Sequence, residues 1–199
     1  MKNSIATAAL IFVVSSINLP WACGQKIFMG FDVFGEFGPS CLYGAVHSSA
    51  TGEAKCETGR LFAGARLRLT RHDALEVSFS YSPDVFNEAY SLDYFNGRLD
   101  SHSFNYVRYL SVNSHLQPFA TVGMGAASFF GDKMGVPSNE SCFAWNYGVG
   151  VDLIPQRFFA LRFELRDYST TLPAYLSSGL HNVVPSIGIV FRFNRNRKL

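Results

Sequence analysis

The sequence predicts an all-β protein, an eight-stranded antiparallel up-and-down transmembrane β-barrel. Three observations predict this fold. About eight extended segments alternate apolar and polar side chains, the connections between them alternate between short and long, and the polar faces combine arginines and acids with many glycines. Short turns at one end and long loops at the other are typical of outer-membrane barrels.

The first residues predict a secretory signal peptide over residues 1 to about 24. Lys2 precedes an apolar run from Ile5 to about Leu19, and small residues follow at Ala22 and Gly24. That run is short for a membrane span. We therefore expect residues 25–199 to form an outer-membrane β-barrel domain with a short C-terminal tail. Lipidation at Cys23 is an alternative, although "PW" at 20–21 fits such a processing site poorly.

Composition is consistent with one domain that does not bind nucleic acid. The 199 residues are 48% apolar and 16% charged, and the formal net charge is only +2. Basic residues are interleaved with acids and apolar groups instead of forming the clustered stripe that phosphate binding requires. A core of adequate size is expected, without a nucleic-acid partner.

Period-two alternation places the strands and their connections along the chain. The expected strands are 26–37, 60–70, 74–83, 102–110, 117–129, 142–153, 158–168 and 183–193. "RHD" at 71–73, "SVNSHL" at 111–116 and "IPQR" at 154–157 are the short connections. The long ones are 38–59, 84–101, 130–141 and 169–182.

The stretch "RFFALRFELRDY" at 157–168 poses the question of which face meets water. Phe163 and Leu165 alternate with Arg162, Glu164 and Arg166, so one face is apolar and the other charged. An arginine facing lipid at the midplane would cost about 2–4 kcal/mol, and glycines on polar faces give a narrow lumen room for arginines. We therefore expect the charged face inside. The facing of 102–110 stays open.

A closed lumen is expected, because about eight strands enclose only enough space for side chains. Mixed acids and bases there should form mutually paired clusters. If "RHD" is the turn, Arg68 faces Glu76, and a turn near Gln156 sets Gly150 opposite Arg162 and Gly148 opposite Glu164. The predicted lumen ion-pair network comprises Arg66, Arg68, Glu76, Asp152, Arg162, Glu164, Arg166 and Arg192.

The region Gln25 to Phe193 resembles the small eight-stranded outer-membrane barrels, the outer-membrane protein A-like transmembrane domain and its relatives. The resemblance is carried by "PFATVGMGAA", by "WNYGVGVDL" beside "ALRFELRDY", and by the final "GIVFRF". It implies an assembly signal of the form Gly-x-x-aromatic-x-aromatic, matched by Gly188, Phe191 and Phe193, and hence contact with the barrel assembly machinery during insertion. The tail "NRNRKL" departs from the pattern, since the last aromatic is not terminal.

The cysteines favour a disulfide over a metal site. Without the leader, Cys41, Cys56 and Cys142 remain, and Cys41 and Cys56 bracket a polar stretch in an exported chain. We predict a bridge between them in the first external loop. These cysteines have neither C-x-x-C spacing nor a nearby histidine pair, so neither a metal nor a cofactor is expected.

The sequence indicates a non-enzymatic integral protein of the bacterial outer membrane. We expect a monomer embedded in outer-membrane lipid, with a structural role or a surface-interaction role through its external loops. One alternative is a secreted soluble lipocalin-like barrel that binds a small apolar ligand with its faces reversed. Another is an outer-membrane lipid A hydrolase, suggested by "SHSF". His102 and Ser103 are adjacent, however, and in a strand they face opposite sides.

Overall fold

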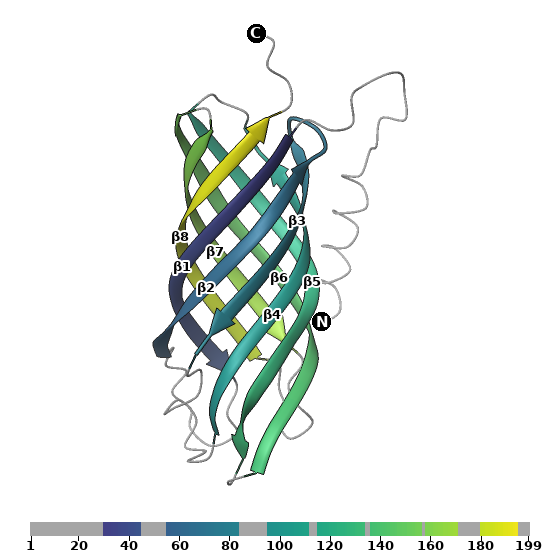
Figure 1. Ribbon diagram of the computed structural model, residues 1–199, viewed down its shortest axis with the longest axis vertical. Coiled ribbons are helices and arrows are strands. Elements are labelled where there is room, and N and C mark those ends of the chain that lie inside the picture. The colour runs from purple at the N-terminus through teal and green to yellow at the C-terminus, as the bar shows by residue number, and fades with distance from the viewer. Residues whose placement is uncertain are drawn as a thin grey trace, which may run out of the picture.

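The chain folds into a closed barrel of eight antiparallel strands in the computed structural model (Figure 1). The structure describes residues 30–44, 55–83, 95–111, 115–133, 136–156, 158–170 and 180–194. The strands are β1 (Gly30–Gly44), β2 (Lys55–Arg68), β3 (Asp73–Ser82), β4 (Phe95–Tyr109), β5 (Leu116–Lys133), β6 (Val136–Gln156), β7 (Phe159–Thr170) and β8 (Leu180–Asn194). Each pairs with the next, and β8 pairs with β1 to close the wall. The predicted fold class is confirmed.

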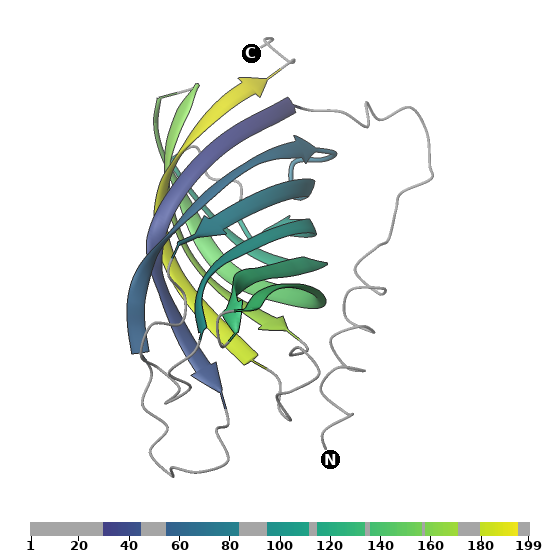
Figure 2. The ribbon, with the colours of Figure 1, turned by 60° about the horizontal axis from the view of Figure 1, so that its bottom comes forward.

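Strand β1 lies between β2 and β8, as Figure 2 shows from a second direction. The wall is therefore hydrogen-bonded all the way round, which removes the strand edges that would otherwise need a partner. None of the described residues forms a helix with the length and apolar composition of a membrane span.

Several strands extend further toward the long-connection end than the alternation predicts. β1 continues to Gly44, and β4 already begins at Phe95. The expected long connection 130–141 is wrong: β5 runs to Lys133 and β6 begins at Val136, so two residues join them. Backbone pairing continues where neither face is uniformly apolar, and the period-two signal fades there. In Figure 1 this hairpin reaches beyond the other strands.

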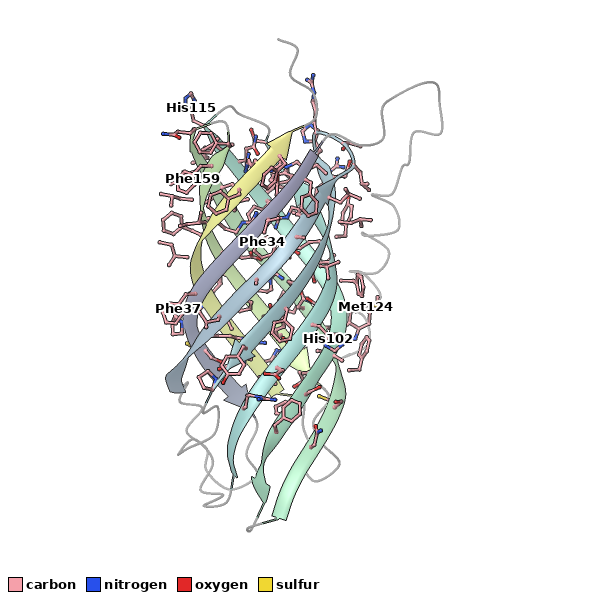
Figure 3. The ribbon with its side chains drawn as sticks, in the orientation of Figure 1. Phe34, Phe37, His102, His115, Met124 and Phe159 are labelled. Carbon is pink, nitrogen blue, oxygen red and sulfur yellow. The ribbon has the colours of Figure 1, made fainter. Side chains whose placement is uncertain are left out.

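Burial decides which face is inside. On β7, Phe163 and Leu165 are 41% and 49% exposed, whereas Arg162 is fully buried and Glu164 is 5% exposed. In Figure 3 the side chain of Phe34 lies within the barrel, and Phe37 and Met124 point away from it. The charged face is therefore the lumen face, the reverse of what a soluble lipocalin-like barrel would need.

The open question of strand 102–110 is resolved in the same way. Ser103 and Asn105 are buried, and Phe104 is 68% exposed. Arg108 shares the outward parity of Phe104, but it lies at the end of β4 and pairs with Asp73. Its position at the rim explains why the parity looked contradictory in the sequence.

Two predicted registers are wrong by two residues. Arg68 pairs across with Ala74, and Glu76 lies opposite Arg66. The turn consists of residues 69–72, where the amides of Leu69 and Thr70 both donate to the carbonyl of Asp73. A shift of two residues keeps every side chain on its predicted face and changes only its partner.

The β6–β7 register also differs by two residues, in the opposite direction. Gly150 faces Glu164 and Gly148 faces Arg166, so the predicted pairs of Gly150 with Arg162 and Gly148 with Glu164 are not formed. An irregularity between Leu153 and Gln156 accompanies this change. As a result Asp152 is the residue directly opposite Arg162.

Candidate functional site

The lumen holds the charged residues that the sequence points to, and the central group is built around Glu76 on β3. Arg66 Nε donates to Glu76 Oε2 at 2.9 Å, and Arg166 Nη2 donates to Glu76 Oε1 at 2.9 Å. Asn105 Nδ2 also donates to Oε1 at 3.0 Å. Arg166 Nε reaches Glu164 Oε1 at 2.7 Å. One carboxylate therefore joins β2, β3, β4 and β7 across the interior.

A second group surrounds Asp152 on β6. Arg162 Nε donates to Asp152 Oδ1 at 2.8 Å, and Arg192 Nη2 donates to Oδ2 at 2.7 Å. Arg162 Nη1 also reaches Glu36 Oε1 at 3.3 Å, and Ser186 Oγ donates to Glu36 Oε2 at 2.6 Å. Asp152 and Arg162 are fully buried, so both charges depend on these partners instead of on water.

A third group at the short-turn end of the lumen combines charged and neutral side chains. Arg68 Nε donates to Asp32 Oδ2 at 2.7 Å, and Arg68 Nη2 donates to the hydroxyl of Tyr109 at 2.8 Å. Arg192 Nη1 donates to Gln117 Oε1 at 3.0 Å. All eight residues of the predicted network therefore lie in the lumen, each with at least one partner of opposite charge.

Aromatic rings fill the space between the arginines. The Cζ of Arg162 lies 4.7 Å from the ring centre of Phe34 and 5.1 Å from that of Phe119. The Cζ of Arg66 lies 4.7 Å from the Phe119 ring. Guanidinium groups over ring faces are attracted by the ring quadrupole, most strongly when desolvated. Phe34 and Phe119 are 3% and 1% exposed, so the rings also exclude water from the ion pairs.

Arg60 makes a different layer, nearer the long-connection end. Its Nε and Nη2 donate to Ser80 Oγ at 3.0 and 2.8 Å, and Nη2 also donates to Ser101 Oγ at 2.7 Å. Its Cζ lies 4.3 Å from the ring centre of Tyr168 and 5.2 Å from that of Phe62. Among the described residues it contacts no carboxylate. Toward the long-connection end of the lumen, hydroxyls and aromatic rings therefore take the place of ion pairs.

Glycines on the lumen face leave the room that these long side chains occupy. A Cβ at Gly150 would lie 2.5 Å from the Phe119 ring and 2.8 Å from the carbonyl oxygen of Phe163. A Cβ at Gly188 would lie 2.4 Å from the Cγ of Glu36. Gly188 on β8 faces Arg162 on β7 and Glu36 on β1, so its lack of a side chain lets that pair meet.

The structure also places the other residues that the sequence singled out. Phe191 and Phe193 are 49% and 61% exposed on the outer face of β8, where an assembly factor could reach them; their role as a signal stays a prediction.

Cys41 is disulfide-bonded, and the residue opposite it across the β1–β2 ladder is Cys56. Cys142 retains its thiol. The described part of the chain has no group of His, Cys, Asp or Glu side chains suited to a metal ion.

Sequence reasoning left several lumen residues out of the network. Asp32 and Glu36 share the parity of their strand's polar face, so a stricter use of alternation would have included them. Arg60 has the parity of Arg66 and Arg68. Phe34, Gln117 and Phe119 likewise share the parity of the polar faces of their strands, so alternation also places them inside, whereas Tyr109 belongs to the strand whose facing stayed open. Alternation gives the facing of these residues, but it does not tell which arginine on another strand each ring packs against.

Comparison with known proteins gives one family. A family model described as the outer membrane protein beta-barrel domain matches residues 10–193. No curated protein sequence matches the chain.

Solved structures share the fold at low sequence identity. Neisserial surface protein A (NspA) superposes with a TM-score of 0.65 at 13% identity, over 82% of this chain and 97% of that one. The N-terminal barrel domain of Pseudomonas aeruginosa OprF gives 0.57 at 14%, over 86% and 100%. Ail, the attachment invasion locus protein of Yersinia pestis, gives 0.52 at 13%, over 81% and 98%.

Proposed function

The chain belongs to the outer membrane protein beta-barrel domain family, and from that premise we propose that it is a closed, non-enzymatic barrel that acts through its external end. Its location is the bacterial outer membrane. The observation that carries the proposal is the filled lumen, in which buried arginines are paired with acids and packed against rings.

A solute could cross this barrel only by separating several buried contacts at once. Arg66, Arg162 and Arg166 are each 4% exposed or less, and they come from two strands on different sides of the wall. Breaking one buried ion pair by removing a partner costs about 3–5 kcal/mol. A continuous water path would disturb at least the Glu76 and Asp152 groups together. The energetics therefore favour a closed barrel over a pore.

The hydrolase alternative loses its candidate site. His102 is exposed on the outer face of β4, whereas Ser103 points inward and its Oγ lies 2.8 Å from that of Ser78. A nucleophile and its base must lie within hydrogen-bond reach of one another, and these two side chains are on opposite sides of the wall. The pair that suggested lipid A hydrolysis is therefore not assembled.

Support for an external role comes from strands that extend beyond their neighbours at the long-connection end of the barrel. β6 pairs with β7 only from Ala144, opposite Thr170, so residues 136–143 of β6 pair with β5 alone among the described strands. β4 likewise continues beyond its pairing with β3, from Leu99 back to Phe95. A three-stranded extension therefore projects outward. NspA is by name a surface protein and Ail an attachment protein, and a surface-interaction role for this chain agrees with those names.

The test is conductance of the purified, folded monomer in planar bilayers, with a known porin in the same bilayers as positive control. Folding is verified beforehand by heat-modifiable migration on a gel. We expect no stable porin-like conductance. Large, long-lived channels from the monomer would contradict the closed lumen and with it the proposal.

A further inference from the structure

Arg60 is the lumen arginine that has no acidic partner within the described part of the chain. Its side chain is buried, at 1% exposed, so bulk water does not compensate its charge. The other lumen arginines, each paired with a carboxylate, are Arg66, Arg68, Arg162, Arg166 and Arg192. These six arginines share five carboxylates, Asp32, Glu36, Glu76, Asp152 and Glu164, so the described lumen carries one positive charge in excess.

The contacts of Arg60 leave one nitrogen of its guanidinium without an acceptor. A guanidinium carries five N–H donors in one plane. Nε and Nη2 donate to the hydroxyls of Ser80 and Ser101, whereas Nη1 has no hydrogen-bond partner among the described residues. The rings of Phe62 and Tyr168 attract the positive charge, but a ring is a poor acceptor for an N–H group. A buried donor without an acceptor and a buried charge without a counterion are both costly.

A second buried donor lies on the same side of the barrel. Asn182 on β8 is 3% exposed; its Oδ1 accepts from Ser40 Oγ at 2.9 Å, and its Nδ2 has no hydrogen-bond partner in the described part of the chain. Ser40 lies on β1, opposite the residue two positions before Arg60 on β2. Asn182 is also the β8 residue opposite Tyr168, and the Cζ of Arg60 lies 4.3 Å from the centre of the Tyr168 ring. Both donors therefore adjoin the same tyrosine.

We propose that this part of the lumen binds one small monovalent inorganic anion, such as chloride, which accepts hydrogen bonds from Arg60 Nη1 and Asn182 Nδ2. One negative charge balances the single positive charge in excess, whereas a divalent anion would reverse the imbalance. The interior of a barrel of about eight strands has room for side chains or one small ligand. Hydrogen bonds from a charged donor to an anion are about twice as strong as those between neutral groups.

An anion suits these groups better than water does. A water molecule would accept the hydrogen bonds but would leave the charge of Arg60 without a counterion. The bound anion is a fixed part of the filled lumen and does not cross the barrel. This inference goes beyond the proposed function, and its failure would leave the expected conductance result unchanged.

The experiment measures urea unfolding of the full mature chain, refolded into lipid vesicles in sodium chloride or in sodium gluconate at equal ionic strength, so that screening stays constant. Gluconate is too large for a lumen filled by side chains. One test variant is Arg60→Gln, which removes the excess charge. The other is Asn182→Asp, which keeps the acceptor for Ser40 and supplies a carboxylate in place of the anion. The control is Arg98→Gln, which removes an arginine whose side chain is 46% exposed.

A ligand that binds only the folded state shifts the unfolding equilibrium with its concentration. For wild type and the control, the ratio of folded to unfolded protein should rise about tenfold for each tenfold rise in chloride above the dissociation constant. Both test variants should lose this dependence. Asn182→Asp should do so while remaining stable, so it decides the question even if Arg60→Gln does not fold. Chloride dependence that persists in either folded test variant would overturn the proposal, and so would its absence from wild type.

Bromide in place of chloride gives the position of the anion, because its anomalous scattering identifies it in crystals of the mature chain. We expect a peak within hydrogen-bond distance of Arg60 Nη1 in wild type and none there in Asn182→Asp. A carboxylate from one of the connections at this position would contradict the site. Bromide on the outer surface alone would also contradict it, as an adventitious ion only.

Discussion

Replacing Glu76 with alanine measures how much the lumen ion pairs stabilise the barrel. The side chain is buried, and its two oxygens accept hydrogen bonds from Arg66, Arg166 and Asn105. Removing it leaves Arg66 without its carboxylate partner, while Arg166 retains Glu164. Removing one partner of a buried pair costs about 3–5 kcal/mol. We expect Glu76→Ala to lower the free energy of unfolding by that amount.

The assay is urea unfolding in lipid vesicles, followed by the fluorescence of Trp145, which is 45% exposed on the outer wall. The matched control is Asp100→Ala: Asp100 also pairs with an arginine, at 3.3 Å, but the Arg98 side chain is 46% exposed. Exposed pairs contribute about 0–1 kcal/mol. If Glu76→Ala cost no more than Asp100→Ala, the buried pairs would not be what stabilises the lumen, and the reasoning would fail.

Two further predictions concern other parts of the wall. Gly150→Ala should destabilise the barrel by about 1–3 kcal/mol through overlap with Phe119. Gly35→Ala should change the stability little, because its Cβ would lie 3.8 Å from the carbonyl oxygen of Phe62. Equal unfolding midpoints for the two variants would contradict the packing argument. Alkylation of the mature chain without reductant should label Cys142 but not Cys41 or Cys56, as read by intact mass; labelling of all three equally would rule out the bridge. Closing that loop stabilises by about 3 kcal/mol in the chain-entropy model.

The sequence alone was sufficient for strand number and for the facing of the strands other than 102–110, because both follow from alternation. On β7 every second residue from Ala160 to Tyr168 is buried, as a period of two requires. A single charged face also decides between lipid and lumen, since the cost of arginine in lipid exceeds any gain from reversing the strand. These predictions depend on local pattern and on one large energy.

Pairing between strands could not be predicted with the same success. The residue opposite Glu76 depends on whether the β2–β3 turn holds three or four residues. Hydrogen bonds between Thr70 and Asp73 within this turn fix its length at four. A shift of two residues is invisible to alternation because every side chain keeps its face. Contacts such as Arg162 with Glu36 join strands far apart in the sequence, and only closure of the barrel brings them together.

Charge balance within the lumen explains why different side chains fill its two ends. The described lumen holds six arginines and five carboxylates, so one arginine cannot have an acid of its own. That arginine is Arg60, whose Nη1 has no hydrogen-bond partner and whose other donors reach two serines. Its position against the rings of both Phe62 and Tyr168 replaces a missing counterion with aromatic rings. The lumen is therefore filled by ion pairs toward the short turns, and by hydroxyls and aromatic rings toward the long connections.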